Sequence, residues 1–344
     1  MALETLGEFA GQPVWLWIAF LSFVGFVLWV DLALINNKDG RISAKKSALM
    51  WASFAACALV FAGYVYFIYE PDPAFYTNPE NLNAQATLQY LTGYLLETAL
   101  AFDNIFVISM LFTLFAVPAA YQHRVLFWGI IGALVFRAIF IGAGAAIVNQ
   151  FTWVLYIFAA ILIFSGIKML LSKEGHEEAP KSEWIVNLVK RVIPVTPEIK
   201  GHNFFARLPD STGRIVLHAT PLLLALVSVE VADIIFAVDS VPAIFAVTRD
   251  PFIVYTSNIF AILGLRSLYF MLAAAKDKFS YLKIGLAAVL VLIGGKIIWN
   301  FLLNKQLNLV PYIEAHWSLI ATLVLVGGAI LLSLLCPPKA KAKT

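Results

Sequence analysis

Five acidic side chains lie inside long apolar stretches of this sequence. Glu97 and Asp103 form one group, and Glu230, Asp233 and Asp239 form a second. If these stretches cross a membrane, each carboxylate at the bilayer centre costs about 2.5–3.5 kcal/mol on insertion scales, and five together cost on the order of 12–18 kcal/mol. We therefore expect the five acids to be paired with cations, protonated or bound to an ion.

Two arginines in similar stretches, Arg137 and Arg266, can balance the charge of two of these acids. Protons or bound cations must offset the remaining charge. Neither histidine nor cysteine accompanies the acids at comparable depth, and oxygen ligands suit Mg²⁺, Ca²⁺ and Mn²⁺ better than Zn²⁺, Cu²⁺ or Ni²⁺. The sequence thus favours a site for a hard divalent cation. A network of acids and arginines that only holds helices together is the alternative, and Asp31 fits either reading.

Helical spacing repeats between the two groups of acids. Two residues that are seven apart lie within about 20° of each other on a regular helix. Asp103 and Asp239 each directly precede the second residue of such a pair, and they point about 100° away from it. The pairs that are seven apart are Glu97 with Asn104 and Asp233 with Ser240. The predicted ligands of the ion are Glu97, Asp103, Asn104, Glu230, Asp233, Asp239 and Ser240.

A proline follows the second group of acids and predicts an irregular helix there. Pro242 has no backbone N–H, so the carbonyl of Val238 loses its helical partner. We expect a broken helix beside Asp239, where carboxylate and carbonyl oxygens both face an ion.

The composition places these residues in a membrane protein of the all-α class. Hydrophobic residues make up 61% of the chain and charged residues 13%, whereas soluble domains contain about 45–50% and about 25%. A membrane-spanning helix needs about 20 apolar residues. Nine stretches qualify: 14–35, 47–69, 88–115, 122–148, 151–171, 218–247, 253–275, 282–303 and 316–336.

The connections between these stretches alternate in charge. The 36–46 and 172–217 segments are rich in Lys and Arg, whereas 70–87 contains neither. Because cytoplasmic loops carry the excess of basic residues, this alternation predicts an inner-membrane protein with its N-terminus outside and its C-terminus in the cytoplasm. The first residues include Glu4 and Glu8 but no basic residue, which is not the pattern of a signal peptide.

Spans three to five resemble spans six to eight. The matches extend beyond the acids to Arg137 with Arg266 and to Gly166 with Gly294. The predicted topology gives the two units opposite directions, which is the inverted repeat of many secondary transporters. The predicted organisation is two peripheral spans in 1–87, a first repeat in 88–171, a cytoplasmic loop in 172–217, a second repeat in 218–303, and a last span with a basic tail in 304–344.

The 172–217 loop contains a candidate amphipathic helix that begins near Ser182. Its apolar face is expected to hold Trp184, Ile185, Leu188, Val189 and Val192, and the helix is expected to lie on the inner membrane surface. Two lysines at the ends of spans, Lys168 and Lys296, are expected to extend towards the membrane surface. The two cysteines, Cys57 and Cys336, lie in apolar segments without ligand spacing and are expected to be small buried residues.

The motifs around the acids resemble those of the TerC/Alx family of bacterial inner-membrane proteins, within the LysE transporter superfamily. The stretches that carry the resemblance are residues 90–97, 102–104, 229–244 and 257–266. The resemblance implies Mn²⁺ export from the cytoplasm, with older associations to tellurium resistance and to the alkaline-pH response. It also implies a metal site on Glu97, Asp103, Asn104, Asp233, Asp239 and Glu230.

Three classes of function can be considered for this sequence. The first is a secondary transporter that exports Mn²⁺ along an ion gradient, with protons as the expected coupling ion, since no phosphate-binding Gly-Lys motif is present. The second is an accessory protein that hands metal to secreted enzymes or to a secretion complex, with the 172–217 loop as its docking surface. The third, a membrane enzyme, lacks a paired nucleophile and base. The expected partners are a divalent ion and the bilayer, with no organic cofactor and no nucleic acid.

Overall fold

The computed structural model describes residues 7–35, 44–76, 79–151, 153–171, 182–199, 201–209, 214–272, 281–307 and 309–335. Within these ranges, nine helical segments are long and apolar enough to cross a membrane, which confirms the predicted class and number of spans. The spans are α1 Val14–Ile35, α2 Ala44–Phe67, α3 Leu82–Leu114, α4 Ala119–Gln150, α5 Val154–Leu171, α7 Pro221–Val247, α8 Pro251–Leu263 with α9 Leu265–Leu272, α10 Leu282–Ile297 with the π-helix η5 Ile298–Gln306, and α11 Ala315–Leu335.

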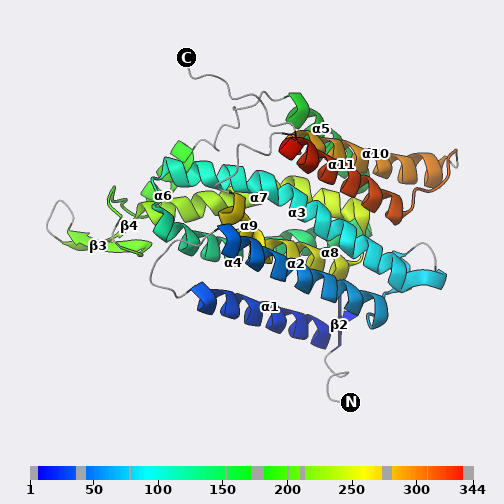
Figure 1. Cartoon of the computed structure of the whole chain (residues 1–344), viewed down its shortest axis with the longest axis horizontal. Helices are drawn as coiled ribbons and strands as arrows, with labels where there is room; N and C mark the ends of the chain where they lie inside the picture. The colour runs from blue at the N-terminus through cyan, green and yellow to red at the C-terminus, as the bar shows by residue number, and fades with distance from the viewer. Residues whose placement is uncertain are drawn as a thin grey trace.

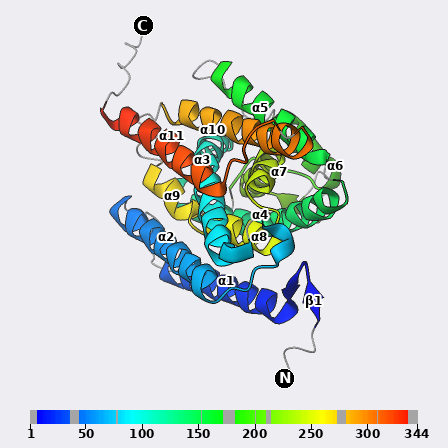
Figure 2. The same ribbon diagram turned by 90° about the vertical axis from the view of Figure 1, so that its right-hand side faces the viewer.

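The spans run side by side, with α3, α7 and α8 in the interior of the bundle (Figures 1 and 2). Helices α1 and α2 cover one side, and α5, α10 and α11 cover the other. All residues of α8 are buried, and it packs against α2, α3 and α4. This burial accounts for polar residues such as Thr256 and Asn258 in a span, because no part of α8 faces lipid.

The two candidate repeat units contact each other in matched pairs. Helix α3 packs against α8 while α4 packs against α7, and α5 packs closely on α10. Gly166 of α5 and Gly294 of α10 each sit against the backbone of the other helix: an added Cβ would lie 2.8 Å from the Ala287 carbonyl in the first case and 2.9 Å from the Ala159 carbonyl in the second. Small residues allow such close approach. The matched contacts fit two similar units, and their inversion stays a prediction.

Helix α7 is continuous through Pro242, so the predicted break at this position is wrong. A proline removes one hydrogen bond from a helix, but its neighbours can hold the helix together by packing. Val241, Ala243 and Ile244 are all buried in the main core. The interruption occurs instead in the next span, where Gly264 separates α8 from α9.

The segment between α5 and α7 contains the predicted short helix and an unpredicted hairpin. Helix α6, Ser182–Val192, packs on α7 through Val189, whereas Leu188 and Val192 are exposed. Its predicted position on the membrane surface stays a prediction. The side chains of Trp184 and Ile185 lie outside the described part. Strands β3 Phe205–Pro209 and β4 Ile215–Ala219 pair antiparallel and project beyond the bundle (Figure 1).

Four shorter elements lie at the opposite end of the bundle. Strands β1 Glu8–Phe9 and β2 Gln12–Pro13 pair just before α1, and the 3-10 turns η2 Pro73–Phe75 and η3 Pro79–Asn81 precede α3.

Lys296 near the end of α10 is buried and donates to the Ser318 hydroxyl of α11 at 2.7 Å. The prediction that this lysine extends to the membrane surface is therefore wrong. Cys336 and the basic tail lie outside the described residues.

Candidate cation site

A buried arginine joins acids from two different spans. Arg137 of α4 is 1% exposed. Its guanidinium contacts Glu97 of α3 through Nη1 and donates to Asp233 of α7 through Nη2, with an Nη2–Oδ1 distance of 3.2 Å. Nη1 also donates to Asn258 Oδ1 at 2.9 Å and to Ser240 Oγ at 3.3 Å. The predicted pairing of Asp233 with Ser240 on one face of the helix is thus observed, since both contact the same arginine.

The two carboxylates of this cluster have more oxygen atoms than the described donors can satisfy. One guanidinium faces two carboxylates, and the second oxygen of each, Glu97 Oε2 and Asp233 Oδ2, is buried without a hydrogen-bond partner in the described part. A buried carboxylate oxygen without a donor loses its solvation and gains nothing in exchange. These two oxygens are therefore suited to receive a cation.

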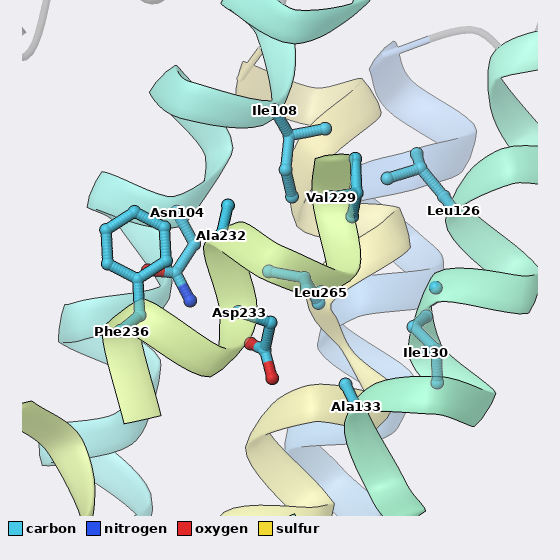
Figure 3. A pocket seen from close by; sticks show the side chains of 11 residues that line it. Asn104, Ile108, Leu126, Ile130, Ala133, Val229, Ala232, Asp233, Phe236 and Leu265 are labelled. Atoms are coloured by element: carbon cyan, nitrogen blue, oxygen red, sulfur yellow. The ribbon is translucent and has the colours of Figure 1, made fainter. Parts of the chain in front are cut away.

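A small cavity of about 20 Å³ adjoins Asp233, between α3, α4, α7 and α9. Asn104 and Asp233 supply its polar side chains (Figure 3). The remaining lining residues are apolar: Ile108, Leu126, Gly129, Ile130, Ala133, Val229, Ala232, Phe236 and Leu265. A space of roughly 10–15 Å³ holds one water molecule, so this cavity accommodates a particle of about that size.

Glu230 lies about one helical turn before Asp233 and turns towards α4. Its carboxyl group packs directly against Gly132, where a methyl group would overlap all three carboxyl atoms. Glu230 Oε2 is buried without a hydrogen-bond partner in the described residues. The absence of a side chain at Gly132 therefore makes the space that Glu230 occupies.

The other predicted ligands are not gathered at Arg137. Asp239 of α7 accepts a hydrogen bond from the Ser165 hydroxyl of α5 at 2.7 Å, on a different side of α7. The side chain of Asp103 lies outside the described part. Among the described side chains, no three of Asp, Glu, His and Cys come close enough together to hold a metal ion. The cation site suggested by the structure therefore centres on Glu97 and Asp233, with Asn104 and Glu230 beside them.

The second predicted charge-balancing residue has a different partner. Arg266 of α9 pairs with the Asp31 carboxylate of α1 and lies 3.5 Å from the backbone carbonyl of the same residue. The expectation that Arg266 balances one of the five motif acids is thus corrected. This pair joins the first span to the bundle. Asp31 therefore belongs to a contact that holds helices together.

Asn258 was not predicted as a site residue. It is fully buried on α8, receives a hydrogen bond from Arg137 and donates to the Val254 carbonyl at 2.9 Å. The sequence did contain a signal, because an amide inside an apolar span requires a polar partner.

A second polar cluster lies at the end of the bundle where α8 begins. The Asp250 carboxylate caps α8 and accepts hydrogen bonds from the Tyr69 and Tyr76 hydroxyls at 2.8 and 2.7 Å. Burial raises the pKa of the Asp250 carboxyl, and the hydrogen bonds from the two tyrosines oppose that rise. The cluster connects the α2–α3 segment to the start of α8.

Comparison with known proteins places this arrangement in a family. The sequence model of the integral membrane protein TerC family matches residues 82–341. The chain belongs to this family. The match begins at α3 and includes every residue of the Arg137 cluster.

Similar TerC family proteins occur in several bacteria. A membrane protein of Myxococcus xanthus designated STKORF319 is 48% identical over 282 residues, which cover 82% of each chain. A membrane protein of Rickettsia felis is 40% identical over 93% of this chain and 97% of its own. A protein of Escherichia coli K12 named as the membrane-bound redox modulator Alx is 44% identical over 84% of this chain and 86% of its own. No solved structure is similar.

Proposed function

We propose that this TerC family protein is a secondary transporter that exports a divalent metal cation from the cytoplasm, with Mn²⁺ as the substrate. One observation carries the proposal. Glu97 and Asp233, from the first span of each candidate repeat, meet across a single arginine in the interior and keep one buried carboxylate oxygen each without a partner. Buried acids of this kind mark ion pathways in membrane proteins.

The chemistry of the side chains supports a hard cation. The polar groups at the site, the carboxylates of Glu97 and Asp233 with Glu230 and Asn104 nearby, offer oxygen atoms, and oxygen ligands suit Mn²⁺, Mg²⁺ and Ca²⁺. The choice of Mn²⁺ among these rests on the TerC family resemblance. Asp103 and Asp239 remain candidate ligands for another step of transport.

The cavity lies towards the predicted cytoplasmic end of the bundle. Ile108 and Leu126 in its lining lie near the end of α3 and the start of α4. The predicted topology places this end in the cytoplasm, with the protein in the bacterial inner membrane. The Asp250 cluster lies at the opposite end of the bundle. An ion that enters from the cytoplasm therefore meets Asp233 and its cavity before it reaches the Asp250 cluster, and the direction of transport rests on the TerC family resemblance.

The relatives named Alx suggest a different role, redox modulation. Within the described residues the one cysteine is Cys57, which is exposed on α2, so the prediction that it is buried is wrong. A thiol–disulfide exchange would need a second thiol from outside the described part, so the buried acids support transport better.

Purified protein in liposomes tests the proposal. We expect Mn²⁺ to cross the membrane without any added partner, and Glu97→Gln to abolish that flux while the protein still inserts. The accessory role, delivery of metal to secreted enzymes or to a secretion complex, predicts Mn²⁺ binding without flux. Absence of both binding and flux would refute the transporter.

A further inference from the structure

Arg137 occupies the place that a cation bound by Glu97 and Asp233 would take. Its guanidinium lies between the two carboxylates, with one nitrogen directed at each. A divalent ion that binds the same pair must come close to this positive charge, and at such distances in a protein interior like charges repel strongly. The arginine and the ion therefore compete for the two carboxylates.

The cluster also offers Arg137 a second set of partners. Asn258 Oδ1 and Ser240 Oγ accept from the same nitrogen that contacts Glu97, and both groups are neutral and buried. A guanidinium that gives up the two carboxylates can keep these acceptors, so it is not left buried without hydrogen bonds. Leaving it without any acceptor would be strongly destabilising.

We propose that Arg137 acts as a tethered substitute for the transported ion, an inference that rests on the proposed function. In the empty carrier it neutralises Glu97 and Asp233. When the ion binds, the guanidinium moves onto Asn258 and Ser240 and the ion takes the carboxylates. The empty carrier can then change conformation without two unpaired buried charges, which is the step that returns it for the next ion.

Binding and flux separate this role from simple charge balance. Free Mn²⁺ is measured by electron paramagnetic resonance in the presence of purified protein in nanodiscs. Because a competing positive charge is removed, we expect Arg137→Gln to bind Mn²⁺ about tenfold more tightly than wild type. We expect the same variant to lose most of its net flux in liposomes. Arg249→Gln is the matched control, since Arg249 stacks on Phe301 outside the site, and its Mn²⁺ affinity should equal wild type.

A second variant gives an independent test of the substitute role. In Arg137→Ala, added guanidinium ion should enter the vacated space and weaken Mn²⁺ binding competitively, whereas wild type should not respond. Equal Mn²⁺ affinity of wild type and Arg137→Gln, or no guanidinium competition in Arg137→Ala, would overturn the substitute role while leaving transport intact. Failure of wild type to bind Mn²⁺ would refute the proposed function itself.

Discussion

At the scale of single residues, the environment of each acid separates the roles of acids that look alike in sequence. Asp233 faces Arg137 and the cavity, whereas Asp239 accepts from Ser165 on α5. The first arrangement is suited to binding an ion. The second places a carboxylate on a different side of the same helix.

Neutralising each acid distinguishes these roles. We expect Asp233→Asn to weaken Mn²⁺ binding by about tenfold or more, because a hard ion depends on carboxylate charge. Arg137 keeps Glu97 in this variant, so the protein level should stay near wild type. We expect Asp239→Asn to retain Mn²⁺ binding and to reduce efflux from manganese-loaded cells. Equal loss of binding in both variants would mean that Asp239 also ligates the ion.

Gly132 provides a second test at this scale. Gly132→Ala should displace the Glu230 carboxyl and weaken Mn²⁺ binding, while Gly142→Ala on the same helix should have no effect, because nothing lies within 4 Å of its added Cβ. Combining Gly132→Ala with Glu230→Ala should cost no more than Glu230→Ala alone. Additive losses would show that Gly132 acts on something other than Glu230.

At the scale of elements, the α5–α10 contact is the closest packing between the candidate repeats. Alanine normally stabilises a helix relative to glycine by about 1 kcal/mol. We expect Gly166→Ala and Gly294→Ala to lower the melting temperature in detergent instead, because their Cβ atoms would meet backbone carbonyls. Gly295→Ala is the control, with open space at its Cβ. Unchanged melting in all three variants would show that the two helices can separate at no cost.

The sequence predicted the spans better than it predicted their irregularities. Hydrophobic length located all nine, because a bilayer requires about 20 apolar residues. Helix α3 begins at Leu82 rather than 88, since its polar first turns carry no such signal. Strand β4 was partly assigned to the following span because its residues are apolar, although turn-forming residues precede it in 210–213.

The site was predictable in composition but not in pairing. The cost of burial identified Glu97 and Asp233 without any structure, and seven-residue spacing placed Ser240 beside Asp233. Which arginine meets which acid depends on how the spans pack, and sequence periodicity within one helix carries no such information. The predicted partners of Arg266 were therefore wrong, since it pairs with Asp31.

At the scale of the whole molecule, an odd number of spans places the two termini of the chain on opposite sides of the membrane. In Figure 1 both α1 and α11 run from right to left, so the start of α1 and the end of α11 point to opposite sides. In a background with both native cysteines replaced, we expect Ala74→Cys to react with an impermeant thiol reagent in intact cells and Asn187→Cys to be protected. Both positions are exposed in the structure. Labelling of both, or of Asn187→Cys alone, would contradict the proposed orientation.

The complete burial of α8 has a consequence for biogenesis. This span carries an asparagine, and α9 continues it with a buried arginine, so the segment has little affinity for lipid on its own. During synthesis it should leave the translocon only when the earlier helices are present to receive it. Placed alone in a reporter protein, residues 251–272 should integrate less efficiently than residues 316–333, which contain no acidic residue, lysine or arginine, as measured by glycosylation mapping. Adding α3 and α4 upstream should raise the integrated fraction, and equal integration of the isolated segments would contradict this order of assembly.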